Sequence, residues 1–189
     1  MADVTSVLTA ESQDRDPVTV VVLTEPQARE VARGLVAELT EVAVSAFGGP
    51  PWNESAVQAG QLTGRLVADA EEPGFALAFA FYGAGSGVAG FAYGLNRRPA
   101  ARYGIPGTGD GPPFELCELA VRSAARGRGT GRRLHDAVLD VSGPQPRWLV
   151  THPAAVPAVT LYRAAGWRAR GLVPGAADGL PRMVMTRDR

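Results

Sequence analysis

The sequence predicts an α/β protein with one mixed, mostly antiparallel sheet of six to seven strands and about four helices. Segments of strand character alternate with segments of helical periodicity along the 189 residues, as in α/β folds. Two strand pairs, at 75–95 and 167–187, have no helix between their members, which is typical of antiparallel hairpins. Because this length suffices for one buried core, we expect a single domain over 18–189 after a disordered, polar tail at 1–17.

β-Branched residues and helical periodicity define the first elements. Residues 18–23 are rich in valine and predict a strand. Apolar residues at helical spacing follow, so a single helix is expected over 25–47, before a Gly-Gly-Pro-Pro turn. Asn53 is the expected N-cap of a second helix, which stops before Pro73.

The middle of the chain predicts a hairpin followed by a long loop. Apolar strands at 75–82 and 88–95 flank a glycine-rich turn, which is typical of a hairpin tip. The loop at 96–113 is rich in Gly, Pro and Arg, and it is expected to be either a substrate lid or plain disorder.

The second half alternates strand and helix until a closing hairpin. Its expected elements are strands at 115–121 and 147–151, helices at 130–141 and 155–165, and closing strands at 167–173 and 181–187. Pro144 and Pro146 separate the first of these helices from the strand that follows it. Gly166 is expected to end the second helix in a left-handed conformation.

The most informative segment is the turn at 126–131, Arg-Gly-Arg-Gly-Thr-Gly, between a strand and a helix. A helix N-terminus leaves backbone N–H groups unpaired, and its dipole favours negative charge. Glycines let the main chain approach an anion closely. Four arginines add donors around the turn: Arg126, Arg128, Arg132 and Arg133. The segment therefore predicts a phosphate-binding site.

Other glycine-rich loops fit this turn less well. A P-loop requires a lysine, and the chain contains none. A Rossmann fingerprint requires G-x-G-x-x-G and an acidic residue about 20 positions later, whereas this turn reads G-x-G-x-G and is followed by Asp136 and Asp140. A merely flexible turn would have no use for four arginines beside a helix start.

The net charge is zero, but the charges are unevenly distributed. Residues 1–72 hold twelve acids and four arginines, whereas 97–133 hold eight arginines and three acids. The basic part offers a site for an anionic cofactor. Acids such as Glu38, Glu41 and Glu54 would suit a cationic acceptor, for example an aminoglycoside, a polyamine or a peptide N-terminus. Nucleic acid is not expected as a partner, because no aromatic residues interleave with the arginines.

The single cysteine, Cys117, excludes an intrachain disulfide and a cysteine metal cluster, and its apolar strand predicts a packed thiol. No segment is apolar over the length of a membrane span, and the first residues do not resemble a signal peptide. We therefore expect a cytoplasmic protein without a membrane or metal partner. A homodimer is compatible with the sequence.

Two motifs together resemble the signatures of the GNAT superfamily of acyl-CoA N-acyltransferases. The turn at 126–131 follows the R-x-x-G-x-G order of the pyrophosphate-binding turn, and residues 158–167 resemble A-x-x-L-Y-x-x-x-G-F, with Trp167 in place of Phe. Ala155 departs from the pattern, because many relatives have an asparagine there that contacts the cofactor. The resemblance covers about 18–187; its motifs are specific for the fold and for acyl-CoA binding, not for the acceptor.

The resemblance implies acetyl-CoA as the co-substrate and a V-shaped gap between two splayed central strands. In GNAT proteins the pantetheine arm lies in this gap like an added strand and pairs with main-chain groups, here those around Leu119, Ala120 and Val121. Backbone groups of the turn would hold the pyrophosphate, and the matching residues are Arg126, Gly127, Arg128, Gly129, Thr130, Gly131 and Arg132.

Tyr162 is the candidate acid for the acyl transfer that the resemblance implies. Its spacing matches the tyrosine beside the CoA sulfur in many relatives, where it would also contact the cofactor. A phenol with a pKa near ~10 is protonated at neutral pH and can donate to a thiolate. The alternative is a structural role in its helix. The backbone N–H of Val121 is the candidate donor to the oxyanion.

The base is left open between Glu115 and Glu118, with His152 less favoured. Strand alternation is expected to place the two glutamates on opposite faces of the sheet. Glu115 matches a catalytic glutamate of some histone-type relatives, whereas Glu118 is nearer to the splay. A carboxylate in a half-buried strand is costly unless it is paired, which favours a function for at least one of them. His135 is expected on the surface.

Trp52 and Glu115 are the candidate residues for acceptor binding. In GNAT proteins the segment that joins the first two helices forms one wall of the acceptor cleft, and Trp52 lies in that segment. The alternative for Trp52 is an aromatic side chain that fills the core beneath the Pro-Pro turn. We therefore expect an N-acetyltransferase that moves an acetyl group from acetyl-CoA to a primary amine of a small molecule or peptide by direct attack. The alternative is a non-catalytic acyl-CoA sensor or interaction module of the same fold.

Overall fold

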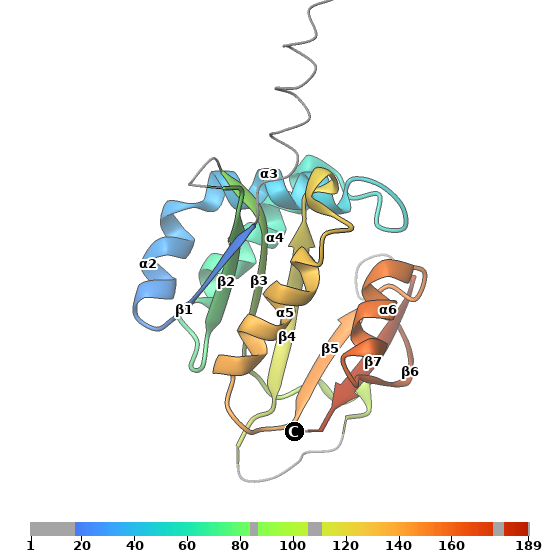
Figure 1. Cartoon of the computed structure of the whole chain (residues 1–189). Coiled ribbons are helices and arrows are strands. Elements are labelled where there is room, and N and C mark those ends of the chain that lie inside the picture. The colour runs from blue at the N-terminus through green and yellow to red at the C-terminus, as the bar shows by residue number, and fades with distance from the viewer. Residues whose placement is uncertain (1–17, 84–86, 106–110, 176–179, 189) are drawn as a thin grey trace, which may run out of the picture.

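The computed structural model describes residues 18–83, 87–105, 111–175 and 180–188. In these ranges the chain forms one seven-stranded sheet with helices against both faces (Figure 1). The predicted tail at 1–17, the tip of the first hairpin and the middle of the predicted loop at 96–113 lie outside the described residues.

The sheet is mixed and mostly antiparallel, as the sequence predicted. Its strands are β1 (Thr19–Thr24), β2 (Ala76–Phe81), β3 (Val88–Asn96), β4 (Phe114–Val121), β5 (Arg147–Thr151), β6 (Arg168–Pro174) and β7 (Pro181–Arg187). They are ordered β1-β2-β3-β4-β5-β7-β6, and among these neighbours only β4 and β5 run parallel.

The helices agree with the prediction in the second half of the chain and differ in the first. The described residues form α2 (Gln27–Gly34), α3 (Val36–Phe47), α4 (Ala56–Asp69), α5 (Thr130–Val141) and α6 (Val156–Ala164), with short 3-10 helices η1 (Ala101–Tyr103) and η2 (Ser123–Ala125). The single helix expected over 25–47 is wrong, because Leu35 adopts non-helical angles (φ −107°, ψ 15°) and separates α2 from α3. Gly34, a poor helix former, precedes the break.

The N-cap of α4 is Ser55 and not Asn53, which corrects a second expectation. Ser55 Oγ accepts a hydrogen bond from the Gln58 N–H (3.3 Å), and Gln58 Oε1 accepts one from the Ser55 N–H (2.9 Å). This reciprocal capping box satisfies two backbone donors, so it sets the start of the helix. Asn53 instead has a positive φ of 49° in the preceding turn.

Alternation along the central strands creates two different core faces. In β2, Leu77 and Phe79 face α2, α3 and α4, whereas the alternating alanines, such as Ala78, face α5. Small residues on the second face let α5 lie close to the sheet. This packing fixes the start of α5, and thus the glycine-rich turn, beyond the end of β4 (Figure 1).

The central strands β4 and β5 separate soon after they meet. They pair only at Phe114↔Arg147 and Glu115↔Trp148 within the described strands, although β4 continues to Val121 and β5 to Thr151. Figure 1 shows the two strands diverging, with α5 beside one and α6 beside the other. The splayed central pair expected from the sequence is confirmed.

A β-bulge at Cys117 places both candidate glutamates on one face of the sheet. Glu115 lies opposite Leu95 of β3, and Glu118 lies opposite Tyr93, so β4 contains one residue more than β3 over this interval. Leu95 and Tyr93 both belong to the core under α2–α4. Because directly opposed residues share a face, the expectation of opposite faces is wrong.

The structure also bears on membrane insertion. Among the helices of the described ranges, none has both the length and the apolar character needed to cross a bilayer.

Candidate active site

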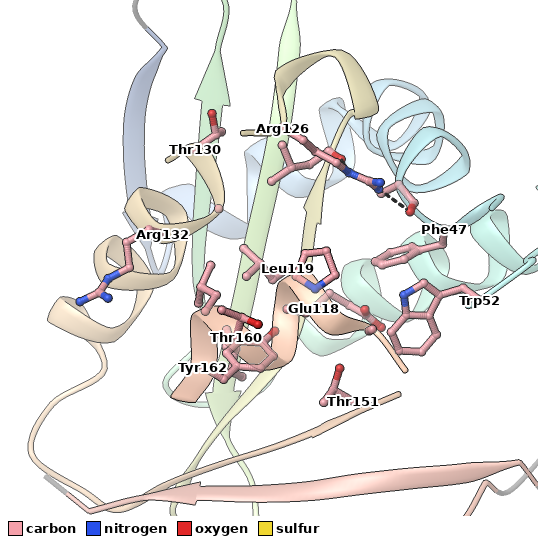
Figure 2. A pocket seen from close by; sticks show the side chains of 18 of the residues that line it. Phe47, Trp52, Glu118, Leu119, Arg126, Thr130, Arg132, Thr151, Thr160 and Tyr162 are labelled. Atoms are coloured by element: carbon pink, nitrogen blue, oxygen red, sulfur yellow. Dashed lines mark hydrogen bonds between the residues drawn. The ribbon is translucent and has the colours of Figure 1, made fainter. Parts of the chain in front are cut away.

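A cleft of about 740 Å³ lies where β4 and β5 separate (Figure 2). One wall is formed by β4 and the turn into α5, a second by β5 and α6, and a third by the end of α3 and the loop after it. The two motifs singled out in the sequence, at 126–131 and 158–167, therefore meet at a single site.

The turn before α5 has the backbone geometry of an anion-binding loop. Gly127 and Gly129 both have φ of 75°, a left-handed conformation that glycine adopts without strain. Gly129 is the N-cap of α5, and the helix ladder begins only at the Arg133 N–H, which donates to Gly129 O (3.0 Å). The N–H groups of the first helical turn therefore have no partner in that ladder. They are the donors that an anion at the helix N-terminus would use.

Space at the turn also fits a phosphate group. A Cβ atom on Gly127 or on Gly129 would meet nothing within 4 Å. Gly129, Thr130, Gly131 and Arg132 all line the cleft. Open space, unpaired donors and a cationic side chain at one place are what pyrophosphate binding requires.

The arginines of the turn have different roles. The Arg126 N–H donates to Ser123 O (3.3 Å), and its guanidinium donates to Val121 O (3.2 Å) and Ala46 O (2.7 Å; Figure 2). Arg126 thus ties the turn to β4 and α3, and its own N–H is already used. Arg133 bonds Val18 O, away from the cleft.

Most of the cofactor residues predicted from the sequence lie at the cleft, but not all of them. Leu119, Val121, Arg132 and Tyr162 line it, together with five of the six residues of the turn, whereas Ala120 is buried in the core and Arg128 is outside the lining. Ala155, which replaces the asparagine of many relatives, also lines the cleft at the N-cap of α6. The binding roles themselves remain predictions.

A larger residue at position 131 should weaken cofactor binding without unfolding the protein. A Cβ on Gly131 would meet Leu161 Cδ1 at 3.4 Å and Val121 Cγ2 at 3.7 Å, which are ordinary contacts. Gly131→Val is therefore expected to fold but to weaken acetyl-CoA binding about 10- to 100-fold, measured by calorimetry. Gly60→Val, on α4 with open space around it, is the control and should bind normally. Equal affinity of both variants would argue against pyrophosphate at the turn.

Tyr162 is held inside the cleft by aromatic neighbours. It is 6% exposed, and its ring lies 6.0 Å from that of Trp167 and 6.1 Å from that of His135. Burial, and secondarily the charge of Glu118, raises the pKa of its phenol above the ordinary value of 10.0. The hydroxyl therefore stays protonated at physiological pH, as an acid or hydrogen-bond donor must.

His135 is fully buried, which overturns the expectation of a surface position. It accepts a hydrogen bond at Nε2 from Trp167 Nε1 (2.9 Å), so the neutral ring carries its proton on Nδ1, which donates to Asp136 Oδ1 (2.8 Å). Burial lowers the pKa of His135, which favours this neutral form. Asp136 Oδ2 in turn accepts a hydrogen bond from Arg132 Nε (2.6 Å). The chain of contacts joins the second motif to the phosphate turn.

A signal for the burial of His135 was present in the sequence. Val138 and Leu139 follow it at spacings of three and four, so all three residues share one side of α5. The side of α5 that carries His135 is part of the core because Trp167 and Tyr162 pack against it.

Removal of this buried imidazole should destabilise the fold. His135→Ala leaves a cavity and a buried indole N–H without its acceptor, so we expect the free energy of unfolding to fall by about 2–4 kcal/mol in urea denaturation. Asp136→Asn keeps an acceptor for the His135 Nδ1–H and loses only the half-exposed ion pair with Arg132, so it should cost less than about 1 kcal/mol. Similar losses in the two variants would contradict this account.

The structure separates the two glutamates that the sequence proposed as bases. Glu118 lines the cleft, whereas Glu115 does not. Glu115 Oε2 lies 3.5 Å from Arg97 Nη1 and has no hydrogen-bond partner among the described residues. Arg97 also pairs with Asp69, which accepts a hydrogen bond from the Tyr93 hydroxyl (3.2 Å). Glu115 thus belongs to a polar cluster beside the cleft.

Burial makes the carboxyls of Glu115 and Glu118 weaker acids than an exposed glutamate. It raises the pKa of Glu118 to about 8, against the favourable charge of Arg65, and that of Glu115 to about 7, against the charge of Arg97. A cleft carboxyl that titrates near neutral pH is suited to proton transfer. Burial also raises the pKa of the Cys117 thiol, which therefore stays protonated.

Trp52 lies at the opposite end of the cleft from Arg132 (Figure 2), whereas His152 is outside the lining. The Trp52 ring meets Phe47 and His152 edge-on, each with ring centres 5.6 Å apart. His152 Nδ1 accepts a hydrogen bond from the Ala154 N–H (3.0 Å), so this nitrogen is not available as a base.

The acids of the N-terminal half do not line the cleft in the described part of the chain. Glu41 pairs with Arg122 (3.0 Å), and Glu38 is exposed. Glu54 is outside the lining, although its charge adds to the raised pKa of Glu118. The same described ranges contain no group of three or more His, Cys, Asp or Glu residues that could hold a metal ion.

Comparison with known proteins identifies the family. The chain belongs to the acetyltransferase (GNAT) family, whose model matches residues 36–167. An uncharacterized protein of Mycobacterium leprae is 38% identical over 89 residues, which are 45% of this chain and 25% of that protein. The chain thus matches about a quarter of that curated relative.

Solved structures share the fold at low sequence identity. A protein of Pyrococcus horikoshii superposes with a TM-score of 0.63 at 18% identity, over 92% of this chain and 99% of that one. The PaiA N-acetyltransferase of Thermoplasma acidophilum, solved in complex with coenzyme A, gives 0.58 at 14% identity, over 92% and 99% of the two chains.

Proposed function

We propose that this protein is an N-acetyltransferase that moves an acetyl group from acetyl-CoA to a primary amine of a small molecule or peptide, by direct attack in a ternary complex. The observation that carries the proposal is the meeting of the anion-binding turn, Tyr162 and Glu118 in one cleft. Membership of the family, and the coenzyme A complex of a protein with the same fold, support an acyl-CoA as the donor.

The cleft walls suit the two halves of the donor molecule. The N–H groups at the start of α5 and Arg132 would hold the pyrophosphate. The edge of β4 that faces the splay, from Leu116 onward, has no β5 partner within the described strands and offers main-chain groups to the pantetheine arm. Leu119 and Val121 lie on this segment and line the cleft.

Acyl transfer in this arrangement uses two side chains. The attacking amine must be neutral, so it gives a proton to the Glu118 carboxylate, and its nitrogen then forms a bond to the thioester carbon. The Val121 N–H, on the same strand, would stabilise the oxyanion. As the carbon–sulfur bond breaks, the Tyr162 hydroxyl gives its proton to the sulfur, and the tyrosinate takes up the second proton of the nitrogen, which leaves a neutral amide. Glu118 then releases the first proton to solvent.

Two measurements test this function. Calorimetry should detect acetyl-CoA binding, and thiol release should follow when an amine acceptor is added. Absence of any binding would refute the proposal. Binding without thiol release or amide formation across a panel of amines would instead support the non-catalytic sensor.

A further inference from the structure

The end of the cleft beyond Glu118 shows which kind of amine would fit. We define the acceptor end by the lining residues Ala46, Phe47, Pro50, Pro51 and Trp52 of one wall, together with Cys117, Glu118 and Thr151. Figure 2 shows the rings of Phe47 and Trp52 at this end, with Glu118 between them and Tyr162. The wall formed by residues 46–52 is apolar, and the Glu118 carboxyl lies between this wall and Tyr162.

The aromatic wall is held in place before any acceptor arrives. Phe47 is 8% exposed and meets the Trp52 ring edge-on, and His152, the residue after β5, contacts the same ring. The Arg182 guanidinium lies 5.9 Å from the centre of the Trp52 ring. An indole fixed by three neighbours presents a flat apolar surface at little entropic cost.

The charges of the cleft limit the acceptor to one ammonium group. Among the described lining residues, Glu118 is the only carboxylate, and the other two charged residues are Arg126 and Arg132. The Arg126 guanidinium is anchored at Ala46 O, at the edge of the acceptor end, where it would repel a second cation. A polyamine or an aminoglycoside carries several positive charges, and the described lining offers only the Glu118 carboxyl to pair with them.

Few polar side chains at this end could recognise a peptide. Its described lining has one hydroxyl, on Thr151, which is 4% exposed, and one thiol, on Cys117. Peptide recognition normally uses main-chain hydrogen bonds or pockets for successive side chains. The wall instead favours burial of one compact apolar group.

From this geometry we propose that the acceptor is a small arylalkylamine, with one ammonium group at Glu118 and an aromatic ring against Trp52 and Phe47. The inference rests on the proposed N-acetyltransferase function and narrows it to a substrate class. It also replaces the expectation of a polycationic acceptor, which rested on the acids of the N-terminal half, because those acids lie outside the cleft lining.

A matched set of amines tests the substrate class. We expect kcat/KM with acetyl-CoA to be at least about tenfold higher for 2-phenylethylamine than for n-propylamine, which lacks the ring, and for spermidine and kanamycin, which carry several charges. In Trp52→Ala the ratio of 2-phenylethylamine to n-propylamine should fall toward one, whereas acetyl-CoA affinity should not change. Trp52→Phe keeps a ring in the wall and should keep most of the preference.

The outcomes separate this inference from the function on which it rests. If acetyl-CoA binds but spermidine or kanamycin equals or exceeds 2-phenylethylamine, or if 2-phenylethylamine is not acetylated, the substrate class is wrong. If acetyl-CoA does not bind, the proposed function fails. Should Trp52→Ala not fold, the comparison of amines with the unmodified protein still decides the substrate class.

Discussion

Tyr162→Phe is expected to lower kcat about 100-fold or more while it leaves acetyl-CoA affinity nearly unchanged. The substitution removes only the hydroxyl, so the ring contacts with His135 and Trp167 persist. The thiolate then leaves without a donor beside it, which affects the transition state more than the bound ground state. Steady-state kinetics and calorimetry with the same acceptor would measure the two quantities separately.

Tyr103→Phe is a matched control for this substitution. Tyr103 lies in η1, outside the cleft lining, and its hydroxyl accepts a hydrogen bond from Arg102 (2.8 Å). Its loss should leave kcat within about twofold, as expected for a surface change. An unchanged kcat in Tyr162→Phe would assign Tyr162 a packing role alone, which was the alternative left open by the sequence.

The second half of the fold was predictable because its signals are local. The helix at 130–141 and the strand at 147–151 occur with the expected bounds, and Gly166 has the expected left-handed φ (86°). Proline and glycine mark the ends of these elements, so their boundaries depend little on tertiary contacts. The break at Leu35 was missed because the apolar spacing continues across it, and spacing does not report backbone angles.

The geometry of the site was predictable where main chain forms it and less so where side chains do. Glycine positions specify the turn directly, so the phosphate-binding prediction needed no tertiary information. The faces of Glu115 and Glu118 depend on the bulge at Cys117, which is a property of strand pairing that one strand's sequence does not contain. The burial of His135 depends likewise on Trp167, which is 32 residues away in the chain.

Glu118→Gln should lower kcat/KM about 100-fold at pH 8 and above, and it should change the pH dependence. Because the carboxyl has a pKa of about 8, its ionised form grows tenfold per pH unit below that value, and kcat/KM should rise accordingly. In the variant only the titration of the amine substrate would remain. Glu115→Gln, on the same face but outside the lining, should lose less than about tenfold. A larger loss in Glu115→Gln than in Glu118→Gln would transfer the base role to Glu115.

As the pH rises, Glu118→Gln should lose activity relative to the unmodified protein but gain stability relative to it. This difference separates a catalytic carboxyl from a structural one. In the unfolded chain the carboxyl of Glu118 ionises near 4.5, and in the folded protein near 8. Folding therefore takes up a proton between these values, so the carboxyl favours folding most at low pH and this contribution is lost as the pH rises toward 8. Gln has no such loss, and the melting temperature of Glu118→Gln relative to the unmodified protein should increase from pH 5 to pH 8. A variant that is less active and also less stable at pH 8 would show that Glu118 is retained for packing, not for proton transfer.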